Sequence, residues 1–551
     1  MKQPYTKIEE LSTVEMQEDT RPPPPPRKRT KPPPVHWMDL PNKDQLFILG
    51  LCRLSEPLSN TCVLPYIYYL IKSIVATSGN VPTKSEADQI SKLSGILVAV
   101  FPLAQFATSM FWARQADTRG RRFVILAGLF GSAISNLAFG FSRSFWALVF
   151  WRTLGGVANG NVGVVRTMTA EIVKERKYQT RAFLLLPLIF NAGMVAGLAL
   201  GGCLAEPAAN LPWLFGPTGL LNFWHYEQGV QWTIDYPYAL PALFNVSLLL
   251  AGLLLAVLGL KETLAGRDGE KHLGINLGRS ILRAAKPFLP RRFTKDYAPL
   301  PLDDLDDTKA PEEEKPLPSL QSSLQPRPTI RNVCTREVIC AIVSFGLLPL
   351  HNSAFMHIFP VYLSNPPASN SNATAFSFNG GLGLQSPSIG LWLGLLGICG
   401  ILLQLFIYPR LQLRFGTLGV FRISLFIFPV TYAMAPYLSL LPQDGKIVTY
   451  WLPIALVAWS QIMARTLAIP STVLLLTDAA PTKSALSTIH GIGNMVACLA
   501  RAIGPAVGGW VFAWGVERDV VGAVWWFYLT VVAIGALVWS YMMEGSGDFE
   551  G

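Results

Sequence analysis

Twelve long apolar runs determine what this chain can fold into. Each run is long enough to cross about 30 Å of hydrocarbon as an α-helix, which rises about 1.5 Å per residue. Six runs precede a long polar stretch and six follow it, at residues 46–71, 93–113, 123–141, 146–169, 182–203, 239–260, 337–363, 388–408, 420–441, 449–476, 485–513 and 521–543. The sequence therefore predicts an all-α polytopic membrane protein with two six-helix bundles.

The amino-acid composition is typical of a protein whose main partner is the lipid bilayer. The chain has 551 residues, of which 51% are hydrophobic and 15% charged, and its mean hydropathy is +0.35. A soluble domain needs more polar surface than this. The net charge of +10 does not indicate nucleic acid, because the lysines and arginines lie in short loops between apolar runs. The seven cysteines form no C-x-x-C pair, so we expect no metal and no cofactor.

Polar segments divide the chain into five parts. Residues 1–43 are proline-rich and predict a disordered cytosolic tail. The N-terminal bundle covers 44–260, the C-terminal bundle covers 337–543, and residues 544–551 form a second tail. Between the bundles, 261–336 is a linker with many acidic residues and prolines.

Basic residues in short loops set the orientation, because such loops stay cytosolic. The loops after the second and fourth runs are rich in lysine and arginine, whereas residues 204–238 and 364–387 contain neither. We therefore expect both termini and the linker in the cytosol. The sequon at Asn372 then lies outside and is a candidate glycosylation site.

The loop after the second run, residues 112–122, reads W-A-R-Q-A-D-T-R-G-R-R. Its residues Asp117, Gly120, Arg121 and Arg122 have two interpretations. In the first they form a conformational latch, in which a carboxylate at a helix end bonds a neighbouring helix N-terminus and the arginines in one conformation only. In the second the arginines only fix the topology.

This loop resembles the signature G-x-L-A-D-R-x-G-R-R of the major facilitator superfamily. The four residues just named match it. Ala113 replaces the first glycine, and Thr118 stands where the family usually has arginine, with Arg119 beside it as a possible substitute.

Charged residues inside two apolar runs are candidates for proton coupling. Arg152 begins a glycine-rich stretch of the fourth run that also resembles the family pattern, and a buried arginine requires a partner. Glu56 lies in the first run, three residues after Arg53 and directly before Pro57, whose kink opens backbone groups. Glu56 is either the proton-coupling carboxylate or half of a structural ion pair with Arg53 or Arg152.

Glycines recur in the fifth and eleventh runs at matching places. Both stretches resemble the antiporter signature G-x-x-x-G-P-x-x-G-G, with leucine in the position of the proline in the fifth run. The residues are Gly193, Gly197, Gly201 and Gly202 in one and Gly504, Pro505, Gly508 and Gly509 in the other. They are either a face on which the two halves rock or an ordinary small-residue packing seam.

Further polar and aromatic residues inside the runs are candidates to line a substrate cavity: Asn191, His351, Phe355 and Arg465. Asn191 could equally tie helices together. His351 and His357 are six residues apart and do not share a helix face, which argues against a two-histidine metal site.

The resemblance covers residues 46–543. Within the superfamily, the glycine pattern and the residues 261–264 (K-E-T-L) resemble the twelve-span drug:proton antiporters, and residues 237–241 (P-Y-A-L-P) are similar to the zinc-induced-facilitator-like group of fungi and plants. This resemblance implies a monomeric secondary transporter in the plasma or vacuolar membrane. It would export small organic solutes or drugs in exchange for protons by alternating access.

An uptake carrier or symporter on the same scaffold is the main alternative. A membrane-embedded enzyme would need a catalytic histidine with an aspartate or nucleophile at one membrane face. The sequence contains no such cluster, so we predict no enzyme activity. A receptor that no longer transports is disfavoured by the intact Asp117 motif.

Overall fold

The computed structural model describes residues 40–75, 84–173, 176–264, 273–285, 335–368, 374–442, 447–481 and 486–543. These residues belong to one compact unit, Leu40–Gly551. In this part of the chain the only β-pairing is two isolated bridges, and the rest of the regular structure is helical. The residues 1–39, most of the linker, Asn372 and 544–551 lie outside the described residues.

The first half of the chain builds long helices joined by short connections, and three short helices in the loop 205–238. They are α1 (Lys43–Thr61), α2 (Ile67–Val75), α3 (Lys84–Arg119), α4 (Arg121–Gly140), α5 (Phe145–Ala158), α6 (Asn161–Ile172), α7 (Arg176–Leu204), α8 (Pro207–Asn210), α9 (Pro212–Phe215), α10 (Gln231–Asp235) and α11 (Ala239–Gly259). From the linker, α12 (Leu273–Ala285) packs on the end of α11.

The second half repeats the long helices, three of which contain or adjoin π or 3-10 segments. They are α14 (Arg336–Ser364), α15 (Ser386–Leu402), η5 (Leu403–Ile407), α16 (Tyr408–Met434), η6 (Ala435–Leu440), α17 (Ile447–Asp478), α18 (Leu486–Glu517), η7 (Val524–Thr530) and α19 (Val531–Ser540).

Helices occupy every apolar run that the sequence singles out, and eight helical segments of the described chain are long and apolar enough to cross a membrane. Two of the predicted spans are each split into two helices, and the last, Val524–Ser540, is a shorter apolar helix. Two other predicted spans, 388–408 and 420–441, form one continuous helical segment, Ser386–Leu440. The all-helical membrane fold is confirmed, and the number of twelve spans stays a prediction.

The helix breaks have local causes. The first predicted span, 46–71, ends as α1 at Thr61 and resumes as α2 at Ile67. Pro65 lies in this break, and the residue before a proline is forced away from helical geometry. Ser386–Leu440 bends at Gly416, whose φ of 70° and ψ of 169° are open to glycine but costly for other residues.

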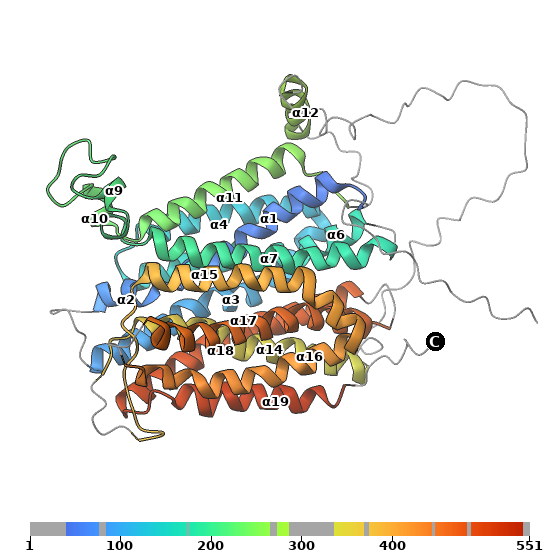
Figure 1. Cartoon of the computed structure of the whole chain (residues 1–551). Coiled ribbons are helices and arrows are strands. Elements are labelled where there is room, and N and C mark those ends of the chain that lie inside the picture. Colours follow the sequence, from blue (N-terminus) through green and yellow to red (C-terminus); the bar gives the residue numbers. More distant parts are fainter. Residues whose placement is uncertain are drawn as a thin grey trace, which may run out of the picture. The chain divides into compact units, whose positions relative to one another are not determined.

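Helix contacts repeat between the halves. In the first half α1 packs on α7, α3 on α5 and α4 on α11; in the second half α14 packs on α18, α15 on α17 and α16 on α19. The most extensive contacts between the halves are those of α3 with α18 and of α7 with α15, and Figure 1 shows α7 and α15 side by side between the two sets of helices. This repetition supports the predicted pair of six-helix bundles, which stays a prediction.

Candidate functional site

A cavity of about 150 Å³ lies between the two halves. Six helices contribute to it: α1, α6 and α7 from the first half and α14, α17 and α18 from the second. Its lining combines apolar and cationic side chains: Arg53, Val162, Arg166, Leu186, Pro187, Phe190, Phe345, Leu348, Pro349, Asn352, Ser353, Ile469, Thr472, Val473, His490, Asn494, Ala497 and Arg501. We call this space the central cavity.

Glu56 and Arg53 form a buried ion pair on α1. Arg53 lines the central cavity and its guanidinium also lies 5.4 Å from the centre of the Phe190 ring. Pro57 follows directly in the same helix, and it lacks the N–H that would otherwise bond the Arg53 carbonyl. Of the two partners that the sequence offered to Glu56, the structure brings Arg53 into contact.

A chain of hydrogen bonds extends from Glu56 into the second half. The Gln105 amide on α3 donates to Glu56 Oε1 (3.4 Å) and to the Asn159 carbonyl (3.2 Å). The Cys498 thiol on α18 donates to Gln105 Oε1 (3.5 Å) and accepts from Arg501 Nη2 (3.2 Å). The carboxylate in the first half is thus linked to a cationic residue of the central cavity in the second half.

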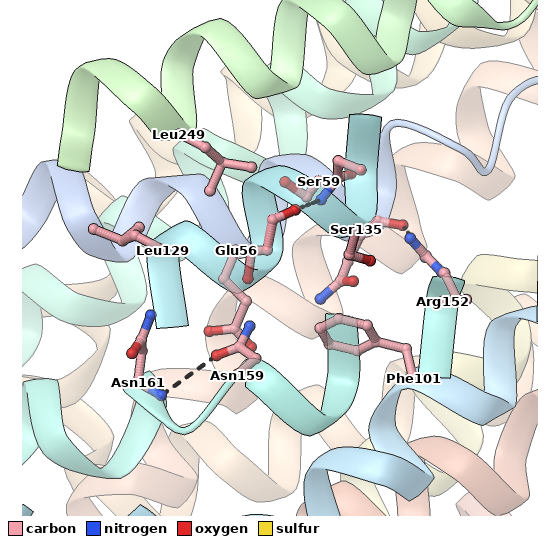
Figure 2. A pocket seen from close by; sticks show the side chains of 12 residues that line it. Glu56, Ser59, Phe101, Leu129, Ser135, Arg152, Asn159, Asn161 and Leu249 are labelled. Atoms are coloured by element: carbon pink, nitrogen blue, oxygen red, sulfur yellow. Dashed lines mark hydrogen bonds between the residues drawn. The ribbon is translucent and has the colours of Figure 1, made fainter. Parts of the chain in front are cut away.

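Arg152 has different partners. Its Nη2 donates to the Asn60 carbonyl (3.3 Å), and its guanidinium lies 5.5 Å and 5.7 Å from the ring centres of Phe101 and Phe139. Arg152 and Glu56 nevertheless line the same small polar pocket inside the first half, and Figure 2 shows Arg152 on the side of Phe101. Glu56 therefore sits at the boundary of two spaces, since its partner Arg53 faces the central cavity.

The loop motif is held by carboxylates from other segments. Glu262 accepts hydrogen bonds from the backbone N–H groups of Arg121 (2.9 Å) and Arg122 (3.1 Å) at the start of α4. Arg121 contacts Glu171 (3.1 Å) and, at a longer distance, Asp117 (3.4 Å). The carboxylate on the helix N-terminus is thus Glu262, and Asp117 is mostly exposed.

Gly120 is required at its place in this loop. Its φ is 105°, and a Cβ built there would collide with the Glu262 carboxylate. The sequence pattern identified the glycine and the arginines, but it did not identify the role of Glu262, because that role depends on where α11 ends.

The glycines of α7 and α18 pack against equivalent neighbours. Cβ atoms on Gly193 and Gly197 would meet α1, one on Gly201 would meet Cys62 at the C-terminal end of α1, and those on Gly504 and Gly508 would meet α14. The last glycine of each motif instead faces the other half of the molecule: Gly202 meets Gly390 of α15, and Gly509 meets Gly95 of α3. Pro505 adds its carbonyl to this second contact, 2.7 Å from a Cβ on Gly95.

Two of the cavity candidates are partnered away from the central cavity. The Asn191 amide donates to Gln404 Oε1 (2.6 Å), which joins α7 to η5 of the second half. His351 is fully buried, with Nδ1 2.8 Å from the Tyr432 hydroxyl and its ring against Phe428. Neither residue lines the central cavity.

The other two, Phe355 and Arg465, line a separate small space between α7, α14, α15 and α17. Phe355 stacks on Phe359 with ring centres 4.9 Å apart. Arg465 Nη1 lies 3.1 Å from Met194 Sδ and 3.3 Å from Met356 Sδ. This arginine thus has soft sulfur neighbours.

Sequence reasoning did not single out Arg166 and Gln105 of the first half, and it did not place Arg501 of the second half in the substrate cavity. A signal was present for Arg166, which is a second cation in the fourth apolar run, 14 positions after Arg152. An ionisable residue inside a membrane span is a functional candidate by default.

Membrane-length apolar helices around a central cavity with buried charges form an integral, multi-pass membrane protein of the transporter class. The sequence matches the Major Facilitator Superfamily over residues 49–366. It is 32% identical over 540 residues to the major facilitator superfamily multidrug transporter mfsB of Aspergillus fumigatus, covering 93% of this chain and 85% of the relative. The chain belongs to the major facilitator superfamily.

Two further comparisons agree. The protein ZINC INDUCED FACILITATOR-LIKE 1 of Arabidopsis thaliana is 25% identical over 86% of this chain and 85% of its own length. The solved structure of the xylose transporter XylE from E. coli, in a partially occluded inward-open conformation, covers 91% of this chain and 98% of that chain with a TM-score of 0.57. At 10% sequence identity this second likeness concerns the fold alone.

Proposed function

We propose that this chain is a proton-coupled exporter of small organic solutes that works by alternating access, with Glu56 as the coupling carboxylate. The observation that carries the proposal is the Glu56–Arg53 pair between the small polar pocket and the central cavity. Protonation of Glu56 removes one charge of this pair, so it changes the electrostatic energy of the cavity and shifts the balance between conformations. The multidrug transporter name of the Aspergillus fumigatus relative supports export.

The hydrogen-bond chain gives protonation a route to the other half. A neutral Glu56 is a poorer acceptor for Gln105, whose amide oxygen holds the Cys498 thiol of α18. Because α3 and α18 pack on each other across the halves, a change in this bond acts on a contact that must rearrange during alternating access.

The test is solute flux in proteoliposomes with an imposed pH gradient, comparing wild type with Glu56→Gln over a panel of organic solutes. We expect proton-driven flux in wild type and its loss in the variant, while exchange of solute without a gradient remains. Glu517→Gln is the matched control, because Glu517 is an exposed carboxylate at the end of α18. Equal proton-driven flux in wild type and Glu56→Gln would remove Glu56 from the coupling role.

Uptake by proton symport is the second candidate function. The Glu56–Arg53 ion pair favours it, because protonation of the carboxylate releases the arginine. When Glu56 is protonated, Arg53 loses its carboxylate partner and faces the cavity as a free cation. A proton and an anionic solute would then promote each other's binding, which is a property of symport. The sign of flux relative to the pH gradient separates the two candidates.

A further inference from the structure

The central cavity has an unbalanced positive charge. Arg53, Arg166 and Arg501 line it, and its described lining contains no aspartate or glutamate. Glu56 neutralises Arg53 from the adjoining pocket, so two positive charges are left. A space with low-dielectric walls strengthens such a field and concentrates ligands of opposite charge.

Arg166 forms no ion pair among the described residues. Its Nη1 is buried without a hydrogen-bond partner, and its guanidinium lies 5.8 Å from the centre of the Phe345 ring. The charges of Arg53 and Arg501, and the opposite charge of Glu56, all act on it. A guanidinium with a buried and unbonded N–H can donate a hydrogen bond to an anionic acceptor.

Arg501 is held only by weak or local acceptors. Its Nη2 donates to the Cys498 sulfur (3.2 Å), and its Nε donates to the Ala497 carbonyl (3.3 Å) of its own helix. In the described part of the chain no carboxylate lies within ion-pair distance of it. A thiol does not neutralise a guanidinium, so Arg501 retains capacity for an anion.

Part of the cavity wall is apolar. Leu186, Pro187 and Phe190 come from α7, and Phe345 and Leu348 come from α14. A ligand that fits both parts of the wall has one negatively charged group and an apolar body. Arg166 is on α6 and Arg501 on α18, so an anion that bonds both joins the two halves of the molecule.

We propose that the substrate is an amphipathic organic anion whose carboxylate binds between Arg166 and Arg501 and whose apolar body lies against Phe190, Phe345 and Leu348. This proposal rests on the proposed function, because it specifies the substrate class of the same cavity. A carboxylate suits two guanidinium groups, since each can donate parallel N–H bonds to its oxygens.

The first test compares three probes of nearly equal shape and different charge on the purified full chain in a neutral detergent. They are 2-naphthoate, 2-naphthylmethylammonium and 2-naphthylmethanol, and the readouts are the thermal unfolding temperature and the dissociation constant. We expect saturable binding of 2-naphthoate and binding of the other two that is at least about tenfold weaker. Equal binding of all three probes, or tighter binding of the cation, would overturn the proposal.

The second test uses charge-removing and charge-retaining variants. Arg166→Gln and Arg501→Gln should each weaken 2-naphthoate binding by about 10- to 100-fold, because a hydrogen bond to a charged group is lost. Arg166→Lys and Arg501→Lys should retain part of the affinity. Arg143→Gln is the matched control, since Arg143 is an exposed cation that contacts Tyr236 outside the cavity. Unchanged affinity in both folded glutamine variants would overturn the site.

An anionic lipid headgroup carries the same chemistry, so the binding test is repeated in nanodiscs with and without phosphatidylglycerol. Affinity for 2-naphthoate that is the same in both supports a soluble anion, and loss of binding with phosphatidylglycerol assigns the site to lipid and overturns the proposal.

Failure of the proposed substrate class can be told apart from failure of the proposed function. Proton-driven flux of the cationic probe alone would refute the anionic substrate class and would still support proton-coupled transport. Binding of the anion without any flux would support the anionic ligand and refute transport.

Discussion

Gly202 of α7 and Gly390 of α15 pack backbone against backbone across the two halves. A Cβ on Gly202 would lie 2.8 Å from the Gly390 Cα, and a Cβ on Gly390 would lie 2.9 Å from the Gly202 Cα. Gly509 and Gly95 make the equivalent contact between α18 and α3, where a Cβ on Gly509 would lie 3.1 Å from the Gly95 Cα. Both contacts lie toward the predicted outer ends of these helices. Glycine on both sides is what allows the halves to approach so closely.

Gly202→Leu should therefore prevent the two halves from closing against each other at the predicted outer ends of these helices. Overpacking costs about 1–3 kcal/mol, so we expect solute flux to fall by roughly tenfold or more. Ser94→Cys, at a fully buried position on α3, reports the opening by faster reaction with an impermeant maleimide added outside. Gly535→Leu is the control, because a Cβ at Gly535 meets nothing within 4 Å. Unchanged flux and labelling in Gly202→Leu would show that close approach is not needed.

Gly120 and Gly416 offer a matched pair in the corresponding loops of the two halves. Both have positive φ, at 105° and 70°, but only a Cβ at Gly120 meets another residue, Glu262. Gly416→Ala should lower the free energy of unfolding by about 1–2 kcal/mol from backbone strain alone. Gly120→Ala should cost more, because it also displaces Glu262 from the start of α4. Thermal unfolding of the purified proteins measures both.

Glu262→Ala completes that comparison. If the additional cost of Gly120→Ala comes from Glu262, the double variant should lose less stability than the two single losses added together. Strict additivity would mean that Gly120 and Glu262 act independently.

The Asn191–Gln404 bond predicts strong coupling between two buried amides. Asn191→Leu leaves the Gln404 amide without this partner, which should cost about 1–3 kcal/mol of stability. Replacing both residues by leucine should cost less than the sum of the single changes. Asn136→Leu is the control, because Asn136 bonds the Ser132 carbonyl of its own helix. Additive losses at Asn191 and Gln404 would exclude a tie between the halves.

The predicted count of twelve spans can be tested directly by finding on which side of the membrane selected loops lie. Cysteines introduced at Thr118 and Asp307 should react only with reagent from the cytosolic side, and one introduced at Trp224 only from outside. Labelling in sealed and permeabilised cells measures this. Finding Thr118 and Asp307 on opposite sides of the membrane would refute the topology.

Much of the fold followed from local sequence signals. The apolar runs located every long helix, because length and hydropathy are properties of a single segment. Pro65 and Gly416 set breaks that the runs alone did not show. The proximity of Glu56 and Arg53 could be read from their spacing, since residues three apart share a helix face.

The remaining parts of the site depend on which helices meet. The Phe101 and Phe139 rings near Arg152, and the Glu262 carboxylate at α4, come from residues distant in sequence. No local pattern indicates such contacts. The cationic character of the cavity likewise emerges only when α6 and α18 are brought together, because Arg166 and Arg501 lie in different halves of the chain.

The excess of arginine in the central cavity also has a consequence for the response to voltage. Fixed charges that face one side of a bilayer and then the other move through the electric field, and one elementary charge crossing 100 mV is worth about 2.3 kcal/mol. In the proposed alternating-access cycle, a negative interior would therefore hold the unloaded carrier with its cavity toward the cytosol. A bound monovalent anion cancels part of that charge, so loading would release the carrier from the electrical bias and make the return of the empty form the voltage-dependent step.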